Sequence, residues 1–124
     1  MKKKTLRDIN IKSKRVIYHC DFNIKLKKNS QGELLPISDV RLKAYFPSIF
    51  YLINHGAKII FISYLERPGG KVVEELRMAP IAKRLSQLIN RQVNYLPELI
   101  GPKVKNFIDK MQPGEMVMLE NTRF

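Results

Sequence analysis

Cysteine and long hydrophobic runs are scarce or missing in this sequence, and each shortage excludes a class of protein. Cys20 is the single cysteine, so an internal disulfide cannot form, and with only two histidines it falls short of a zinc-ligand pattern. Charges interrupt every apolar stretch well before the roughly 20 residues of a membrane-spanning helix. Residues 5–10 (TLRDIN) lack the apolar segment of a secretory signal. The sequence predicts a cytoplasmic protein with no membrane partner and no metal site.

Acidic residues are also few. The 23 lysines and arginines outnumber the 11 aspartates and glutamates, which leaves a formal net charge of +12 and favours anionic partners. Nucleic acid is one such partner, but the basic residues are spread along the whole chain. No RNA-recognition motif, zinc finger or basic zipper is present. Scattered, solvated lysines are the favoured interpretation, and a small basic nucleic-acid-binding protein is the alternative.

Hydrophobic periodicity predicts alternating strands and helices within one unit, because no repeat or linker divides the 124 residues. Strands are expected at 16–22, 58–63, 93–96 and 116–119. Helices are expected at 39–55, 80–89 and 101–112, with a polar loop at 27–38. Ser38 or Asp39 would cap the first helix, and Pro47 either kinks this helix or marks its true first turn.

Strand and helix alternation of this kind predicts an α/β fold with a doubly wound, Rossmann-like parallel sheet in three αβα layers. The last expected strand lies close to Phe124, where a covering helix should begin. We therefore expect an incomplete domain.

Polar residues follow three of the expected strands. Asp21 and Asn23 close the first strand, Arg67 follows the second, Arg123 follows the last, and Arg41 begins the first helix. Ligands of open parallel sheets bind beyond the carboxyl ends of the strands, so these residues are expected at one edge. Arginine forks bind phosphate and carboxylate in bidentate fashion. The set predicts a site for a small anionic ligand with a hydroxyl group, although each residue alone could be a solvated charge or part of a turn.

Nucleotide-binding motifs are absent from the sequence. Residues 69–71 (GGK) do not have the spacing of a phosphate-binding loop, and no G-x-G-x-x-G occurs. We expect no cofactor-binding residues in this chain.

The segments that carry the polar residues resemble, in order, those of phosphoglycerate kinases. Residues 14–23 (KRVIYHCDFN) resemble the first strand and D-F-N segment, and residues 40–58 (VRLKAYFPSIFYLINHGAK) resemble the helix and strand that follow, which implies a helix continuing across Pro47. Residues 63–68 (SYLERP) are similar to S-H-L-G-R-P, residues 79–82 (APIA) to A-P-V-A, and residues 119–124 (LENTRF) to L-E-N-x-R-F.

The resemblance implies a glycolytic phosphotransferase that moves a phosphoryl group reversibly between ATP and 3-phosphoglycerate, giving ADP and 1,3-bisphosphoglycerate. Residues 1–124 would form part of the amino-terminal, phosphoglycerate-binding domain. Mg-ATP or Mg-ADP would bind to a carboxyl-terminal domain that is absent from this chain. We therefore expect the isolated chain not to turn over ATP, unless a complementing carboxyl-terminal fragment joins it.

By motif, Asp21 and Asn23 would orient the hydroxyl and carboxylate end of the substrate, and Arg67 and Arg123 would hold its phosphate. Arg41 would be the catalytic arginine that stabilises the phosphoryl group in transfer.

Lys25 replaces the proline that usually follows the D-F-N segment, and three further departures from the family pattern alter charge near the expected site. His19 stands where members usually have Arg, and Glu66 stands where they have Gly. Tyr64, which the resemblance selects as a further substrate-binding residue, stands where they have His. Each change removes positive charge or adds negative charge beside the expected phosphate site, so weaker substrate binding is predicted. A catalytically inactive remnant is thus the second functional alternative.

Overall fold

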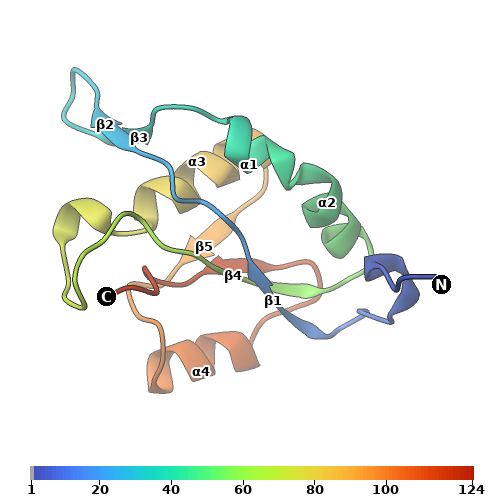
Figure 1. Ribbon diagram of the computed structural model, residues 1–124. Coiled ribbons are helices and arrows are strands. Elements are labelled where there is room, and N and C mark those ends of the chain that lie inside the picture. Colours follow the sequence, from blue (N-terminus) through green and yellow to red (C-terminus); the bar gives the residue numbers. More distant parts are fainter. Residues whose placement is uncertain (1) are drawn as a thin grey trace.

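Four parallel strands in the order β1-β4-β6-β5 form the sheet of the computed structural model, which describes residues 2–124 (Figure 1). The strands are β1 (Arg15–His19), β4 (Lys58–Ile62), β6 (Met116–Met118) and β5 (Val93–Tyr95). β4 pairs with β1 on one side and with β6 on the other. The predicted parallel α/β sheet is confirmed, and the first strand ends at His19, earlier than expected.

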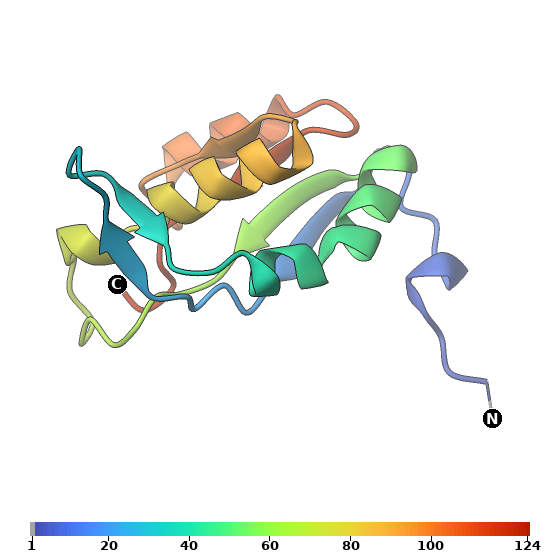
Figure 2. The same cartoon turned by 90° about the horizontal axis from the view of Figure 1, so that it is seen from above.

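Helices cover both faces of this sheet. Helices α1 (Val40–Ala44), α2 (Phe46–Asn54) and α3 (Ala79–Ile89) lie on one face, and α4 (Pro102–Asp109) lies on the other (Figures 1 and 2). Each side has its own cluster of buried apolar residues. The three αβα layers predicted from the sequence are therefore present. None of the helices within residues 2–124 is both long and apolar enough to cross a lipid bilayer.

The burial of each strand reflects its place in the sheet. The centre of β4 is buried on both faces, as its continuous apolar run predicted, with Ile59, Ile60 and Phe61 at most 4% exposed. β1 is an edge strand that alternates in burial, and its Ile17 is 68% exposed. No strand pairs with the outer edge of β1 in the described part of the chain.

A β-hairpin occupies the segment for which the sequence predicted a polar loop, so that prediction is wrong. β2 (Leu26–Lys28) and β3 (Leu34–Pro36) are antiparallel. Their turn is held by the side chain of Asn29, whose Oδ1 accepts hydrogen bonds from the backbone N–H of Gln31 and of Glu33, both at 2.9 Å. Three-residue strands are too short to show the alternation on which a strand prediction depends.

The expected helix at 39–55 is two helices, and the continuous helix implied by the family resemblance is wrong. Pro47 lies in the first turn of α2, where its missing N–H and fixed φ are tolerated. The alternative in which Pro47 marks a true first turn is confirmed. Of the two expected caps, Asp39 is the N-cap of α1 and makes no side-chain capping hydrogen bond, whereas Ser38 Oγ accepts a hydrogen bond of 3.2 Å from the backbone N–H of Val40.

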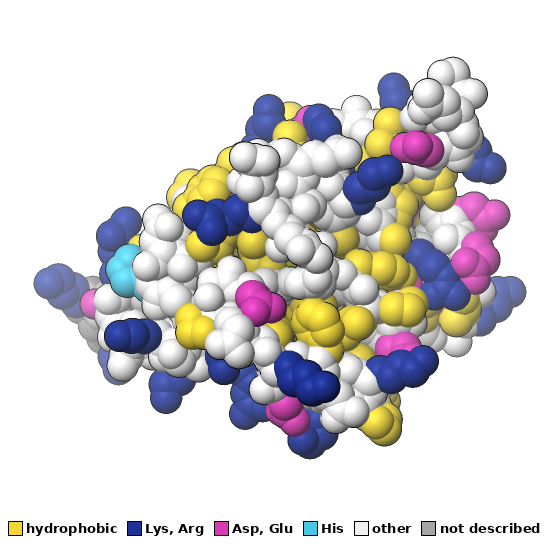
Figure 3. All heavy atoms as spheres, turned by 180° about the vertical axis from the view of Figure 1, so that it is seen from behind, with side chains coloured by type: hydrophobic (Ala, Val, Ile, Leu, Met, Phe, Trp, Pro, Cys, Tyr) yellow, Lys and Arg dark blue, Asp and Glu magenta, His cyan; other side chains and the backbone are white. Residues whose placement is uncertain are grey.

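Lysine and arginine side chains are dispersed over the face seen from behind, both along its outline and within it, and do not gather in one stripe there (Figure 3). This distribution agrees with the interpretation of solvated surface charges.

Candidate anion-binding site

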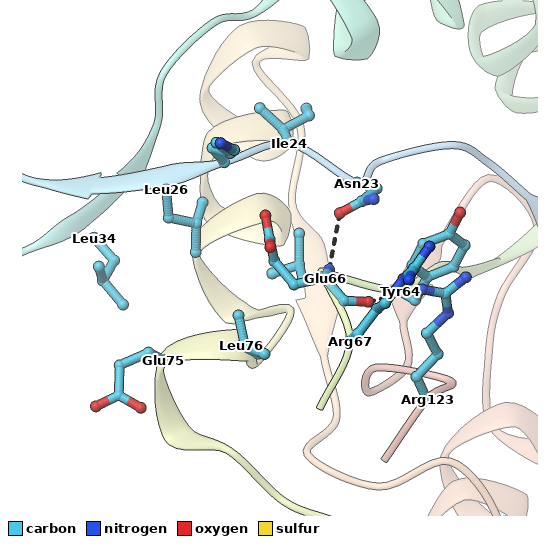
Figure 4. Close-up of a pocket in the computed structure, with 12 residues that line it drawn as sticks. Asn23, Ile24, Leu26, Leu34, Tyr64, Glu66, Arg67, Glu75, Leu76 and Arg123 are labelled. Atoms are coloured by element: carbon cyan, nitrogen blue, oxygen red, sulfur yellow. Dashed lines mark hydrogen bonds between the residues drawn. The ribbon is translucent and has the colours of Figure 1, made fainter. Parts of the chain in front are cut away.

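The carboxyl ends of β1, β4 and β6 meet at one edge of the sheet, next to a cavity of about 760 Å³ (Figure 4). Four of the residues selected from the sequence line this cavity: Asn23, Tyr64, Arg67 and Arg123. They come from the loops after β1, after β4 and after β6. The parallel sheet thus brings together residues separated by up to 100 positions in the chain.

Arg41 and Asp21 lie beside the cavity, and both form hydrogen bonds with Asn23, which lines it. Arg41 Nη1 donates hydrogen bonds to the backbone carbonyl of Asn23 at 2.7 Å and to Asp21 Oδ1 at 3.2 Å. The two side chains are 54% and 58% exposed, respectively. An exposed ion pair of this kind contributes little stability, so Arg41 can exchange Asp21 for an anionic ligand at small cost.

The segment after β1 is held in place by its backbone. The N–H of Asp21 donates to Tyr45 Oη at 2.8 Å, and the N–H of Phe22 donates to Ser63 Oγ at 3.0 Å. Tyr45 is the residue between α1 and α2, so the break between these helices also sets the position of this tyrosine. Asp21 and Asn23 are therefore fixed against both the helices and β4.

The side-chain amide of Asn23 uses its oxygen in a hydrogen bond within the chain, and its nitrogen can still donate to a ligand. Its Oδ1 accepts a hydrogen bond of 2.9 Å from the backbone N–H of Glu66 (Figure 4). Its Nδ2 has no hydrogen-bond partner within residues 2–124. Asn23 can thus offer donors to a ligand, which suits an anionic or hydroxyl oxygen.

Arg123 is held against the loop after β4. Its guanidinium carbon lies 3.6 Å from the centroid of the Tyr64 ring, and its Nη1 donates a hydrogen bond of 2.8 Å to the carbonyl of Glu66. Its backbone N–H donates to Asn121 Oδ1 at 2.9 Å. The arginine therefore has a fixed backbone and a defined side-chain plane.

Arg67 is an unpaired cation of the cavity within residues 2–124. It is exposed and makes no hydrogen bond or ion pair with any residue in the range 2–124. Lys25 lies on the same wall, whereas Glu66 and Glu75 bring negative charge to it. The six selected residues are brought together, in a site that is cationic but partly neutralised.

Comparison with known proteins decides the family. The family model described as phosphoglycerate kinase matches residues 6–124. The chain belongs to the phosphoglycerate kinase family. It is 41% identical over its full length to a phosphoglycerate kinase of Moorella thermoacetica, and 42% identical over 97% of its length to one of Solibacter usitatus.

Solved structures of phosphoglycerate kinases share this fold. The crystal structure of the enzyme from Pyrococcus horikoshii has a TM-score of 0.82 at 32% identity and covers 96% of this chain. That from Coxiella burnetii has a TM-score of 0.76 at 27% identity over 96% of this chain. The chain spans 30% of the length of the two curated relatives and 28% of each of the two structures.

Two buried residues of the segment LENTRF support the candidate site, and neither was among the residues selected from the sequence. Glu120 is 3% exposed and accepts hydrogen bonds from Tyr95 Oη, from the backbone N–H of Met78 at 2.9 Å and from Arg77 Nη1 at 3.0 Å. Burial, followed by the Glu120 carboxylate, raises the pKa of Tyr95 well above its usual range. Glu120 thereby ties β5 and the start of α3 to the end of β6.

Asn121 makes a second connection. Its Nδ2 donates to the carbonyls of Leu65 at 3.0 Å and Leu76 at 2.9 Å, so the loop after β4 is bound to the loop that carries Arg123. The available signal was an acid and an amide, Glu120 and Asn121, directly after the apolar run of β6, because polar groups beside a buried strand need partners.

Two of the departures from the family pattern have structural consequences. Glu66 has φ +53, a left-handed conformation that favours glycine, and its exposed side chain lines the same cavity as Arg67 and Arg123. His19 is exposed at the end of β1 and does not line the cavity. Of the three departures that alter charge, Glu66 and Tyr64 therefore lie at the site, because both line the cavity.

The glycines of residues 69–71 (GGK) do not lead into a long helix. Gly69 and Gly70 have φ +76 and +75 and precede the short 3-10 helix η2 (Glu74–Leu76), not a long helix whose N-terminus could hold phosphate. No cluster of three potential metal ligands occurs among these residues.

Proposed function

We propose that this chain supplies the phosphoglycerate-binding side of a phosphoglycerate kinase, which transfers a phosphoryl group between ATP and 3-phosphoglycerate in glycolysis. The observation that carries the proposal is the hydrogen-bonded series at the sheet edge, from Arg41 through Asn23 and Glu66 to Arg123. It surrounds a cavity with donors from three loops and leaves Arg67 unpaired for a ligand.

The chemistry of the reaction suits such a site. The acceptor is a carboxylate, which is ionised at neutral pH and needs no general base. Catalysis then depends on positioning and on neutralising charge. Arg67 and Arg123 hold the phosphate, Asp21 and Asn23 orient the hydroxyl and carboxylate end, and Arg41 stabilises the phosphoryl group in transfer.

The nucleotide belongs to the remainder of the protein in this proposal. Mg-ATP would bind to a carboxyl-terminal part, and a complementing fragment would have to dock on this chain for turnover. The open outer edge of β1 and the exposed Ile17 support docking there, because unpaired strand edges bind further strands. An inactive remnant is the alternative, and it differs only in the lack of such a fragment.

Titration calorimetry with 3-phosphoglycerate at low ionic strength tests the substrate proposal. We expect saturable binding to the wild-type chain and at least about ten-fold weaker binding to Arg67→Ala, since a charge-assisted hydrogen bond contributes about 1.5–3 kcal/mol. Arg91→Ala is the matched control, because Arg91 is an exposed arginine outside the cavity. Equal losses in both variants would indicate binding to general positive charge, and no binding to the wild type would refute the proposal.

A coupled assay tests the need for a second part. Phosphoglycerate-dependent ADP release is expected only when a carboxyl-terminal fragment of a phosphoglycerate kinase is added. Turnover by the chain alone would refute this division of labour. Salt-dependent retardation of DNA or RNA, insensitive to Arg67→Ala, would favour the nucleic-acid-binding alternative.

A further inference from the structure

The ring of Tyr64 lies against the face of the Arg123 guanidinium, at 3.6 Å from the guanidinium carbon to the ring centroid. This distance is well inside the about 6 Å limit of a cation–π contact. Arg123 is exposed, and an exposed arginine with no such contact samples many rotamers. Tyr64 is only partly exposed and follows the buried Ser63, so it provides a fixed surface.

We propose that Tyr64 is a positioning residue: its ring holds the Arg123 guanidinium in one plane, so that the free N–H groups of the arginine point along its edge into the cavity. The hydrogen bond from Nη1 to the Glu66 carbonyl, at 2.8 Å, fixes the rotation of the guanidinium within that plane. Of the five N–H donors of an arginine, one is used there and the others remain for a ligand.

The ring, and not the hydroxyl, carries this role. Tyr64 Oη makes no hydrogen bond with any residue between 2 and 124, whereas the ring face is in contact with Arg123. Tyr64→Phe should therefore still position the Arg123 guanidinium. Tyr64→Leu should not, although leucine keeps most of the apolar volume. Arg123→Lys should also lose the stacking on the Tyr64 ring, because a compact ammonium lacks the planar fork of arginine.

Side-chain NMR of the 124-residue chain tests the positioning directly. Ring currents should displace the Arg123 Nε–Hε signal in the wild type and in Tyr64→Phe, and the displacement should vanish in Tyr64→Leu. A nuclear Overhauser effect between the Tyr64 ring protons and the Arg123 Cδ protons is expected in the wild type, and this measurement needs no variant. Its absence, or an Arg123 signal that is the same in Tyr64→Leu and wild type, would overturn the proposal.

Ligand affinity supplies the functional test, and only this step rests on the proposed function. Affinity for 3-phosphoglycerate should fall about two- to five-fold in Tyr64→Leu, the loss expected for an exposed cation–π contact, and should change little in Tyr64→Phe. Equal affinities in all three proteins would overturn a role in ligand binding. A wild-type chain that fails to bind 3-phosphoglycerate would refute the proposed function, while the NMR comparison would still decide the position of Arg123.

Discussion

The amide oxygen of Asn23 accepts a hydrogen bond of 2.9 Å from the backbone N–H of Glu66. This single bond joins the loop after β1 to the loop after β4. It also fixes the carbonyl group of Glu66, which receives the Arg123 guanidinium. The position of one cation of the site therefore depends on an amide that is contributed by a different strand.

Asn23 should affect stability and binding through different atoms. Asn23→Asp keeps an acceptor for the Glu66 N–H, so its unfolding free energy should stay near that of the wild type, but it replaces a donor with negative charge and should weaken 3-phosphoglycerate binding. Asn23→Ala should lose about 1 kcal/mol of stability as well. Urea unfolding and calorimetry measure the two effects, and equal stability losses in both variants would contradict this assignment.

Glu66→Gly should improve both stability and ligand binding. A glycine adopts φ +53 without the steric cost of a side chain, so the unfolding free energy should rise by up to about 1 kcal/mol. Removal of the carboxylate from the cavity should tighten 3-phosphoglycerate binding. Glu66→Gln separates the causes, because it removes the charge and keeps the backbone strain. Tighter binding with unchanged stability is expected for that control, and unchanged binding in both variants would exclude the charge effect.

Glu120→Ala should be strongly destabilising. It leaves Arg77, Tyr95 Oη and the Met78 N–H without their buried acceptor, and breaking a buried charged pair costs about 3–5 kcal/mol. Glu74→Ala is the control, because Glu74 also pairs with Arg77 but its side chain is 73% exposed, and its effect should be small. Chemical unfolding measures both variants. Similar effects would show that Glu120 acts only as a surface partner of Arg77.

Low pH should weaken the ion pair between Asp39, the residue before α1, and Arg84 of α3. Hydrogen bonding to Arg84 lowers the pKa of Asp39 in the folded chain, so the carboxylate contributes stability above its unfolded pKa of about 3.9. That contribution is lost as the pH falls through the lower folded pKa. The unfolding free energy between pH 7 and pH 2 should therefore fall less steeply in Asp39→Asn.

Glu33→Gln provides the comparison for the acid profile. Glu33 is 51% exposed and pairs with Lys83 of α3 at 3.4 Å. This variant should keep the acid dependence of the wild type. A profile of Asp39→Asn that is parallel to that of the wild type would contradict the role of the Asp39–Arg84 pair.

The sequence predicted those parts of the molecule that depend on long apolar patterns. The strand β4 is buried on both faces and therefore appears as a continuous apolar run in the sequence. The helix α3 is buried on one face and therefore shows apolar residues at helical spacing after Pro80. The parallel order then places the residues after each strand at one edge, which was enough to select Asp21, Asn23 and the three arginines.

Contacts between distant segments could not be predicted in the same way. The hairpin of β2 and β3 has strands too short for periodicity, and the choice between a kink and a new helix at Pro47 depends on packing around Tyr45. The stacking of Tyr64 on Arg123 and the two hydrogen bonds of Asn121 exist only after the strands have paired. These contacts fix the geometry of the site.

Amide chemical-shift mapping with 3-phosphoglycerate tests the central claim most directly, because it locates the ligand on the wild-type chain. We predict saturable shifts concentrated in residues 21–23, 64–67 and 121–123, with residues 91–92 at the other end of the sheet unaffected. Shifts spread over exposed lysines, or confined to segments away from the carboxyl ends of β1, β4 and β6, would contradict the account.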